Sequence, residues 1–173
     1  MNILKEIQMS KSCAFLGNDY GIGQPPLLKE HIKEQVIRLI NEEDVSIFYV
    51  GLKGSYEKDA YRVVVDVKKE YPSIRIIHVV TSGHELNNTT LYCDGWEYPD
   101  EIERHTYKRW CIVQRNRWLV ENSDFIIAFN EYEGRAYAVC KTARNKGVNV
   151  IELTDIYGKR EVYEKLSKRL SKK

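Results

Sequence analysis

Short, continuously apolar runs alternate along the chain with longer segments whose apolar residues recur every three or four positions. The first pattern is typical of a strand buried on both faces, and the second of a helix with one buried face. Five segments are predicted strands, at 12–17, 46–51, 74–80, 124–129 and 148–153. Five segments are predicted helices, at about 27–40, 57–71, 107–122, 134–146 and, as a closing basic helix, 158–173.

Proline and glycine support several of these boundaries. Pro25 and Pro26 precede the first helix, Pro72 stops the second, and Gly147 is predicted to cap the helix over 134–146. The alternation of strand and helix predicts an α/β fold, a doubly wound, Rossmann-like three-layer sandwich with a mainly parallel sheet of about five strands. The stretch at 81–103 is predicted to be an irregular loop insert, and we expect one domain over 1–173.

Composition narrows the class of protein. The chain has 173 residues, of which 43% are hydrophobic and 30% charged, as in ordinary globular proteins. Its net charge of +2 is too small to indicate a nucleic-acid partner. No apolar run approaches the roughly 20 residues that span a bilayer, and the first eleven residues lack an apolar signal core. We therefore expect a cytoplasmic protein without a membrane partner.

Cysteine and histidine spacing gives no support for a metal site. The four cysteines form no CxxC pair and are expected to be reduced, mostly buried thiols. The histidines are scattered, and a site assembled from His78, His84 and Cys93 lacks the spacing of metal ligands. Neither a metal nor a cofactor is expected.

The segments that follow the predicted strands are the candidate ligand site, because ligands bind at the carboxyl ends of strands in such sheets. Three of these segments open a helix, where glycines let backbone amides approach an anion. Each is compatible with a plain turn, but three on one edge favour a ligand cleft. They read GNDYGIG, GLKGSYEKD and NEYEGRAY. Neither GxGxxG nor GxxxxGK[ST] is present, so the sequence does not indicate a dinucleotide or P-loop site.

Several motifs resemble the SLOG superfamily, which includes the Lonely Guy phosphoribohydrolases. The resemblance covers about 12–153, is greatest to the small YpsA-like proteins, and rests on SCAFLG, FYVGLKGSYEKDA, the KKEYP passage and QRNRWLVENSDFIIAF. It implies a modified Rossmann fold that binds nucleotides or nucleotide-derived ligands, commonly as a homodimer. Arg115 stands eight residues before Ser123, matching the arginine of the enzymatic branch.

The loop after the fourth predicted strand departs from the PGGxGTxxE of those enzymes. Gly134 falls on the last glycine, Arg135 on the threonine and Tyr137 on the glutamate, while Glu131 and Tyr132 take the place of the paired glycines. A tyrosine, with an ordinary pKa near 10, cannot replace the carboxylate at neutral pH. We therefore predict no catalytic residue, although Arg135 would restore one charge-assisted phosphate contact.

These observations predict a protein that binds a nucleotide or nucleotide-derived phosphorylated ligand as a sensor, carrier or sequestering protein. Two alternatives stay open: a nucleotide-processing N-glycosidase (phosphoribohydrolase) that uses Glu131 or Glu133, and a DNA-associated accessory protein. For Asp59, a ribose contact and a charge favourable at a helix start are equally compatible with the sequence. The predicted ligand-binding residues are Gly17, Asn18, Asp19, Gly51, Gly54, Ser55, Asp59, Arg115, Asn116, Gly134, Arg135 and Tyr137.

The helix predicted over 107–122 bears on assembly. It carries more apolar surface than one sheet face readily covers, which predicts a two-fold homodimer. For its tryptophans, Trp110 and Trp118, we prefer packing in the core to stacking on a base.

Overall fold

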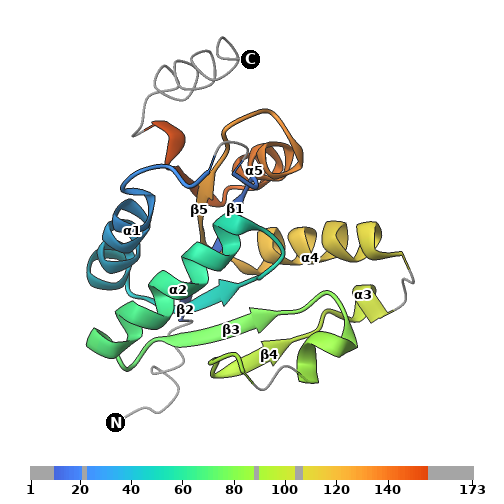
Figure 1. Cartoon of the computed structure of the whole chain (residues 1–173), viewed down its shortest axis with the longest axis horizontal. Coiled ribbons are helices and arrows are strands. Elements are labelled where there is room, and N and C mark those ends of the chain that lie inside the picture. Colours follow the sequence, from blue (N-terminus) through green and yellow to red (C-terminus); the bar gives the residue numbers. More distant parts are fainter. Residues whose placement is uncertain (1–9, 21–22, 88–89, 104–106, 156–173) are drawn as a thin grey trace.

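The computed structural model describes residues 10–20, 23–87, 90–103 and 107–155, which form one parallel sheet between two layers of helices (Figure 1). The strands are β1 (Lys11–Gly17), β2 (Val45–Val50), β3 (Arg75–Val79), β4 (Gly95–Glu97), β5 (Phe125–Phe129) and β6 (Asn149–Glu152). The helices are α1 (Leu28–Glu43), α2 (Ser55–Glu70), the 3₁₀ helix η2 (Gly83–Asn87), α3 (Asp100–Glu103), α4 (Lys108–Asn122) and α5 (Arg135–Asn145). The predicted Rossmann-like three-layer α/β fold is confirmed.

The strand order is β4-β3-β2-β1-β5-β6, and every pairing in it is parallel. The chain builds outward from β1 to β4 and then returns to the other side of β1 to form β5 and β6. This reversal lies between β1 and β5. It is the topological switch point, beside which open sheets of this kind place their ligands.

The strands are continuously apolar because both of their faces are covered. Along β1, Cys13 and Phe15 pack with α1 and α2, whereas Ala14 and Leu16 pack with α4 and α5. Burial raises the pKa of the Cys13 thiol far above its ordinary value and that of the Cys140 thiol to about 11. These two cysteines are therefore protonated at neutral pH and behave as apolar core side chains.

The insert at 81–103 contains more regular structure than its sequence predicts. It forms η2, β4 and α3, and β4 pairs with β3, so the sheet has six strands within the described residues rather than the predicted five or so. β4 is only three residues long, too short for its apolar pattern to show a period. Asp94, just before β4, accepts hydrogen bonds from the backbone N–H of Ile76 (2.7 Å) and from Nζ of Lys68 (2.8 Å), and these contacts hold the strand in place. The helix predicted at 158–173 lies outside the described residues.

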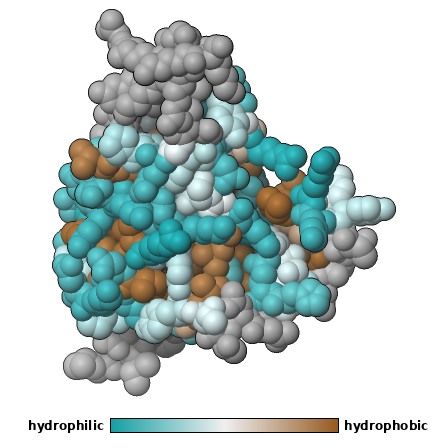
Figure 2. All heavy atoms as spheres, in the orientation of Figure 1, coloured by the Kyte–Doolittle hydropathy of each residue, from teal (hydrophilic) through white to brown (hydrophobic). Residues whose placement is uncertain are grey.

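The surface differs between the two helical layers. The face that carries α1 and α2 is mostly hydrophilic, with its hydrophobic residues in separate patches (Figure 2). On α4, by contrast, Trp110 is 54% exposed and Val113 is also exposed, and Tyr107 is exposed just before the helix begins. The expectation that Trp110 packs in the core is wrong, whereas Trp118 packs edge-on against Tyr49. None of the helices in the described part of the chain combines the length and apolarity needed to span a membrane.

Candidate functional site

The dipeptide Asn18–Asp19 follows β1 at the switch point and joins the two halves of the sheet edge. The backbone N–H of Asn18 donates to the carbonyl of Phe129 (3.0 Å), and its Oδ1 accepts a long hydrogen bond from the N–H of Tyr132 (3.4 Å). Asp19 points the other way, because its Oδ1 accepts from the N–H and the hydroxyl of Ser55 at 2.7 and 3.1 Å. The dipeptide therefore lies between the loop after β5 and the start of α2.

The start of α2 is already occupied by a carboxylate. A helix start attracts anions, because its first N–H groups have no partner within the helix. Here Asp19 accepts from Ser55, and the Ser55 hydroxyl also accepts from the N–H of Tyr20 at 2.9 Å. A Cβ on Gly54 would lie 3.0 Å from the Asp19 carboxylate, so the glycine permits this close approach.

The start of α5, on the other side of Asn18, is organised differently. Gly134, which has no side chain with which to cap the helix, precedes it, and the first turn of the helix contains no acidic residue. Arg135 is exposed at the first position. A Cβ on Gly134 would lie 3.4 Å from Nδ2 of Asn18, which places the Asn18 amide beside the helix start. The N–H groups and the guanidinium at this end favour an anion.

An open pocket of about 540 Å³ lies at the start of α2. Its lining is rich in basic side chains. Lys53 pairs with Glu85 (2.6 Å) and Arg62 with Asp59 (3.1 Å), whereas Lys58 has no ion pair with any residue that the structure describes. The lining residues are Asp19, Tyr20, Gln24, Lys53, Gly54, Ser55, Lys58, Asp59 and Arg62.

Asp59 is a buried carboxylate at the wall of this pocket. It accepts a hydrogen bond from the Tyr20 hydroxyl (3.0 Å) and one from Arg62 (3.1 Å), and it lies 3.4 Å from Nζ of Lys29. These contacts tie the loop after β1 and the start of α1 to α2. Asp59 therefore stabilises the shape of the pocket through partners from three segments of the chain.

Arg115 belongs to a separate, buried group. Its side chain is only 2% exposed, and its two Nη atoms donate to the two carboxylate oxygens of Glu57 at 2.6 and 3.0 Å. Its Nη2 also donates to Oδ1 of Asn116 (2.9 Å). Gly51 is next to this pair, since a Cβ there would lie 2.6 Å from Nη1 of Arg115. The guanidinium is thus directed at Glu57 and does not line the pocket at the start of α2.

The predicted site residues therefore fall into groups rather than into one described concavity. Asp19, Gly54, Ser55 and Asp59 line the pocket; Gly51, Arg115 and Asn116 form the buried group; Asn18, Gly134, Arg135 and Tyr137 lie at the switch point and on α5; and Gly17 packs against the ring of Tyr56.

Sequence reasoning missed the basic lining of the pocket and the partner of Arg115. Lys58 and Arg62 stand four residues apart on a helix that follows a glycine turn, a spacing that places both on one face and could have identified them. Nothing in the sequence indicates that Glu57 contacts Arg115, because the two are 58 positions apart.

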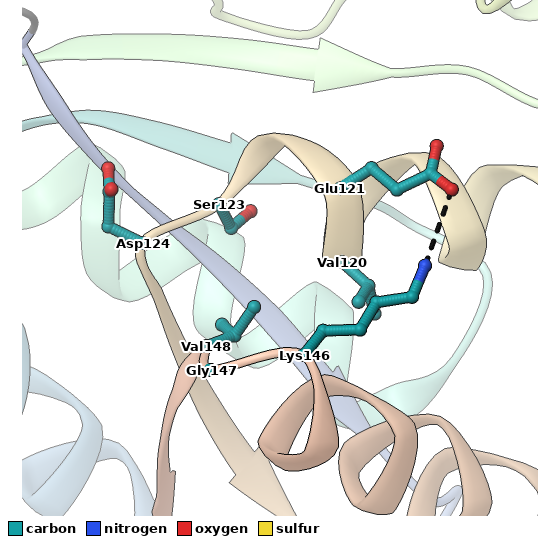
Figure 3. A pocket seen from close by; sticks show the side chains of 7 residues that line it. All are labelled: Val120, Glu121, Ser123, Asp124, Lys146, Gly147 and Val148. Atoms are coloured by element: carbon teal, nitrogen blue, oxygen red, sulfur yellow. Dashed lines mark hydrogen bonds and ion pairs between the residues drawn. The ribbon is translucent and has the colours of Figure 1, made fainter.

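A second open pocket, of about 550 Å³, lies at the opposite edge of the sheet, where β5 and β6 begin (Figure 3). Glu121 and Lys146 face each other across it, 3.5 Å apart, and Glu121 is also paired with Arg117. Asp124 accepts from the N–H of Ser12 (2.8 Å). The charged groups of this second pocket are thus paired with one another or with the backbone. Because it lies away from the carboxyl ends of the strands, we place the candidate site at the switch point.

Fold and site define a Rossmann-like α/β protein with an open pocket, lined by three basic and two acidic side chains, beside its switch point. No protein-family model matches this chain, and a search of curated proteins found no match to it. Among the described residues, no three His, Cys, Asp or Glu side chains are grouped as metal ligands would be.

Proposed function

We propose that this protein binds a phosphorylated small molecule of the nucleotide type at the carboxyl edge of its sheet, as a sensor, carrier or sequestering protein. The observation that carries the proposal is the open pocket at the start of α2, where Lys53, Lys58 and Arg62 gather beside Ser55. Lys53 and Arg62 are paired with carboxylates, so Lys58 is the cation of the pocket that is open to the negative charge of a ligand. The nucleotide class rests on the resemblance of the chain to the SLOG superfamily.

Two positions on this edge are suited to the anionic group of the ligand. The pocket contains Lys58, which has no ion pair within the described residues, and the start of α5 has backbone N–H groups that follow Gly134, together with the exposed Arg135. Asp19 already fills the start of α2, and Glu57 already neutralises Arg115. The ligand is therefore expected to depend on Lys58 and Arg135 rather than on Arg115.

Binding without turnover is the reading that the α5 loop favours. Tyr137 stands where the enzymes that the sequence resembles carry glutamate, and its side chain has no carboxylate to assist cleavage of a glycosidic bond. Glu133, one of the acids that a hydrolase would use instead, is exposed to solvent. An exposed carboxylate keeps its hydration and is a weaker candidate for proton transfer at a shielded site.

The test is a calorimetric titration of the full chain with AMP, ADP and inorganic phosphate. Lys58→Ala and Arg135→Ala should each weaken binding by roughly 1.5–3 kcal/mol, the scale of one charged hydrogen bond. Lys69→Ala is the matched control, because Lys69 is an exposed lysine at the far end of the same helix as Lys58. If none of the three compounds binds, or if both variants bind as tightly as the control, the proposal fails.

We further propose that the protein assembles as a two-fold homodimer through α4. Supporting this, Trp110 and Val113 on α4, together with the adjacent Tyr107, expose large apolar side chains, while the opposite helical layer is mostly hydrophilic (Figure 2). Apolar surface gathered on one helix is typical of a protein interface.

A further inference from the structure

A buried histidine, His78, is linked to the pocket through Glu85 and Lys53, and neither of its ring nitrogens has a hydrogen-bond partner among the described residues. His78, on β3, has a side chain only 3% exposed, and the ring of Trp96 lies 4.9 Å from it, centroid to centroid. Buried polar atoms are nearly always paired, since leaving one unpaired costs about 1–3 kcal/mol. A side chain that keeps two such atoms unpaired calls for a functional explanation.

Four charged groups face His78 from the elements packed around it. Glu85 comes from η2, Lys53 from the loop after β2, Glu57 from α2 and Arg115 from α4. They comprise two anions and two cations, so the cluster is balanced only while His78 is neutral. Burial lowers the pKa of His78 below its ordinary value; Glu85 and Glu57 oppose this shift, and Arg115 and Lys53 add to it.

One carboxylate connects the histidine to the pocket. Oε1 of Glu85 receives Nζ of Lys53 and the hydroxyl of Thr81, both at 2.6 Å. Its other oxygen, Oε2, lies 3.7 Å from Nε2 of His78. Lys53 and a protonated His78 would therefore share the same carboxylate.

We propose that His78 is a proton-sensitive element that releases Lys53 from Glu85 into the ligand pocket. A proton on Nε2 adds one positive charge to a balanced buried cluster. The excess positive charge is removed at the lowest cost when another cation leaves the cluster. Arg115 is buried and held by Glu57, whereas Lys53 is 39% exposed and already lines the pocket. Once protonated His78 has replaced Lys53 as the cation paired with Glu85, the Lys53 ammonium is free to bind an anion.

This inference rests on the proposed function, because it describes the regulation of the same pocket. Proton binding and anion binding are then coupled, and the coupling is reciprocal. Acidification strengthens the binding of an anion, and a bound anion raises the pKa of His78. The protein would hold its phosphorylated ligand more tightly as the pH falls.

The experiment uses sulfate as the probe, because its charge stays constant over the range in which histidine titrates. The His78 ring is titrated by NMR in the full chain, with and without saturating sulfate, and sulfate affinity is measured at about pH 5.5 and about pH 8. His78→Gln removes the proton acceptor, and Lys53→Gln removes the released cation. His84→Gln is the matched control, since His84 is exposed on η2.

We expect sulfate to raise the pKa of His78. We also expect sulfate to bind wild type and His84→Gln about fivefold or more tightly at the lower pH, the usual scale of coupling between sites. His78→Gln and Lys53→Gln should lack this gain.

If His78→Gln does not fold, the sulfate-induced shift of the His78 pKa in wild type and the pH dependence of sulfate binding to Lys53→Gln decide between the outcomes. Sulfate binding whose pH dependence survives in either variant, or an unchanged His78 pKa, overturns the proposed release of Lys53 alone. An absence of sulfate binding at both pH values overturns the proposed release of Lys53 and, if AMP and phosphate also fail to bind, the proposed function.

Discussion

The Glu57 carboxylate and the Arg115 guanidinium form a buried two-point ion pair, with N–O distances of 2.6 and 3.0 Å. Glu57 stands in the first turn of α2 and Arg115 near the middle of α4, so the pair connects the two helical layers at the end of β2. The backbone N–H of Lys53 also donates to Glu57, at 3.0 Å. The pair therefore fixes the turn from which the pocket is built.

Removing Arg115 should be costly. Arg115→Ala leaves the Glu57 carboxylate buried without its counter-charge, and breaking such a pair typically costs about 3–5 kcal/mol. Replacing both partners, as Glu57→Gln with Arg115→Met, should cost less than Arg115→Ala alone, because no unpaired charge remains. The free energy of unfolding in urea measures both effects. A double variant less stable than Arg115→Ala would contradict this account.

Gly51→Ala should also destabilise the protein. Its Cβ would lie 2.5 Å from Oε2 of Glu57 and 2.6 Å from Nη1 of Arg115, so the ion pair would have to shift. Overpacking of this kind costs about 1–3 kcal/mol. Gly83→Ala is the control, because a Cβ at Gly83 meets nothing within 4 Å, and its effect should stay within about 0.5 kcal/mol. Equal denaturation midpoints for the two variants would show that the clash is relieved at no cost.

Stability should fall as the pH drops through the histidine range. Burial lowers the pKa of His78 in the folded protein, while the unfolded chain keeps a value near 6.5. The unfolded state then binds more protons, so the contribution of neutral His78 is complete above about pH 6.5 and is lost as the pH falls towards the folded pKa. The free energy of unfolding should decline less steeply from pH 7 to pH 5 in His78→Gln than in wild type.

Glu85 contributes in a lower pH window, which separates the two effects. Burial acts to raise the pKa of Glu85, but hydrogen bonds from Lys53 and Thr81 outweigh it and hold that pKa below its ordinary value. Its stabilising contribution is therefore present above about pH 4.5 and is lost below it. In Glu85→Gln, the loss above pH 5 should persist while the loss below pH 4.5 shrinks. The reverse pattern would assign the upper window to Glu85.

Turnover of nucleoside monophosphates should be undetectable. An enzyme that lacks its general acid or base is typically slower by a factor on the order of 10²–10⁴, and Tyr137 has no carboxylate to serve in that role. Tyr137→Glu alone should not create activity, because Glu131 and Tyr132 still occupy the places of the paired glycines. Chromatography of AMP incubated with the protein measures the release of free adenine. Release that scales with protein concentration would favour the hydrolase alternative.

The protein should behave as a dimer in solution. Light scattering at micromolar concentration should give twice the 20.3 kDa mass of one chain. Trp110→Glu places a charge in the exposed apolar surface of α4 and should shift the mass towards the monomer, because burying an unpaired charge is unfavourable. Tyr92→Glu, an exposed aromatic residue outside α4, is the control. A wild-type monomer would reject the proposed interface.

The sequence by itself determined the layer architecture and the edge on which to look for a ligand. Runs such as 124–129 are apolar at every position because both faces of the strand are buried, and this pattern is local enough to read directly. The strand ends follow from it, and so do Asp19, Gly54, Ser55 and Asp59 as residues beside a pocket. β4 was not predicted, because its three residues are too few to show a periodic pattern and because Asp94 positions them through tertiary contacts.

Tertiary structure alone decided which charges are free and which are already paired. The sequence motif around Arg115 is the same whether its side chain contacts a ligand or Glu57, because Glu57 lies 58 positions away in the chain. The sequence likewise does not reveal that Asp19 accepts from Ser55, or that Glu85 lies between Lys53 and His78. Pairing depends on distances of a few ångströms between elements distant in sequence, and the energy of a buried charge is set by those distances and by its exclusion from water.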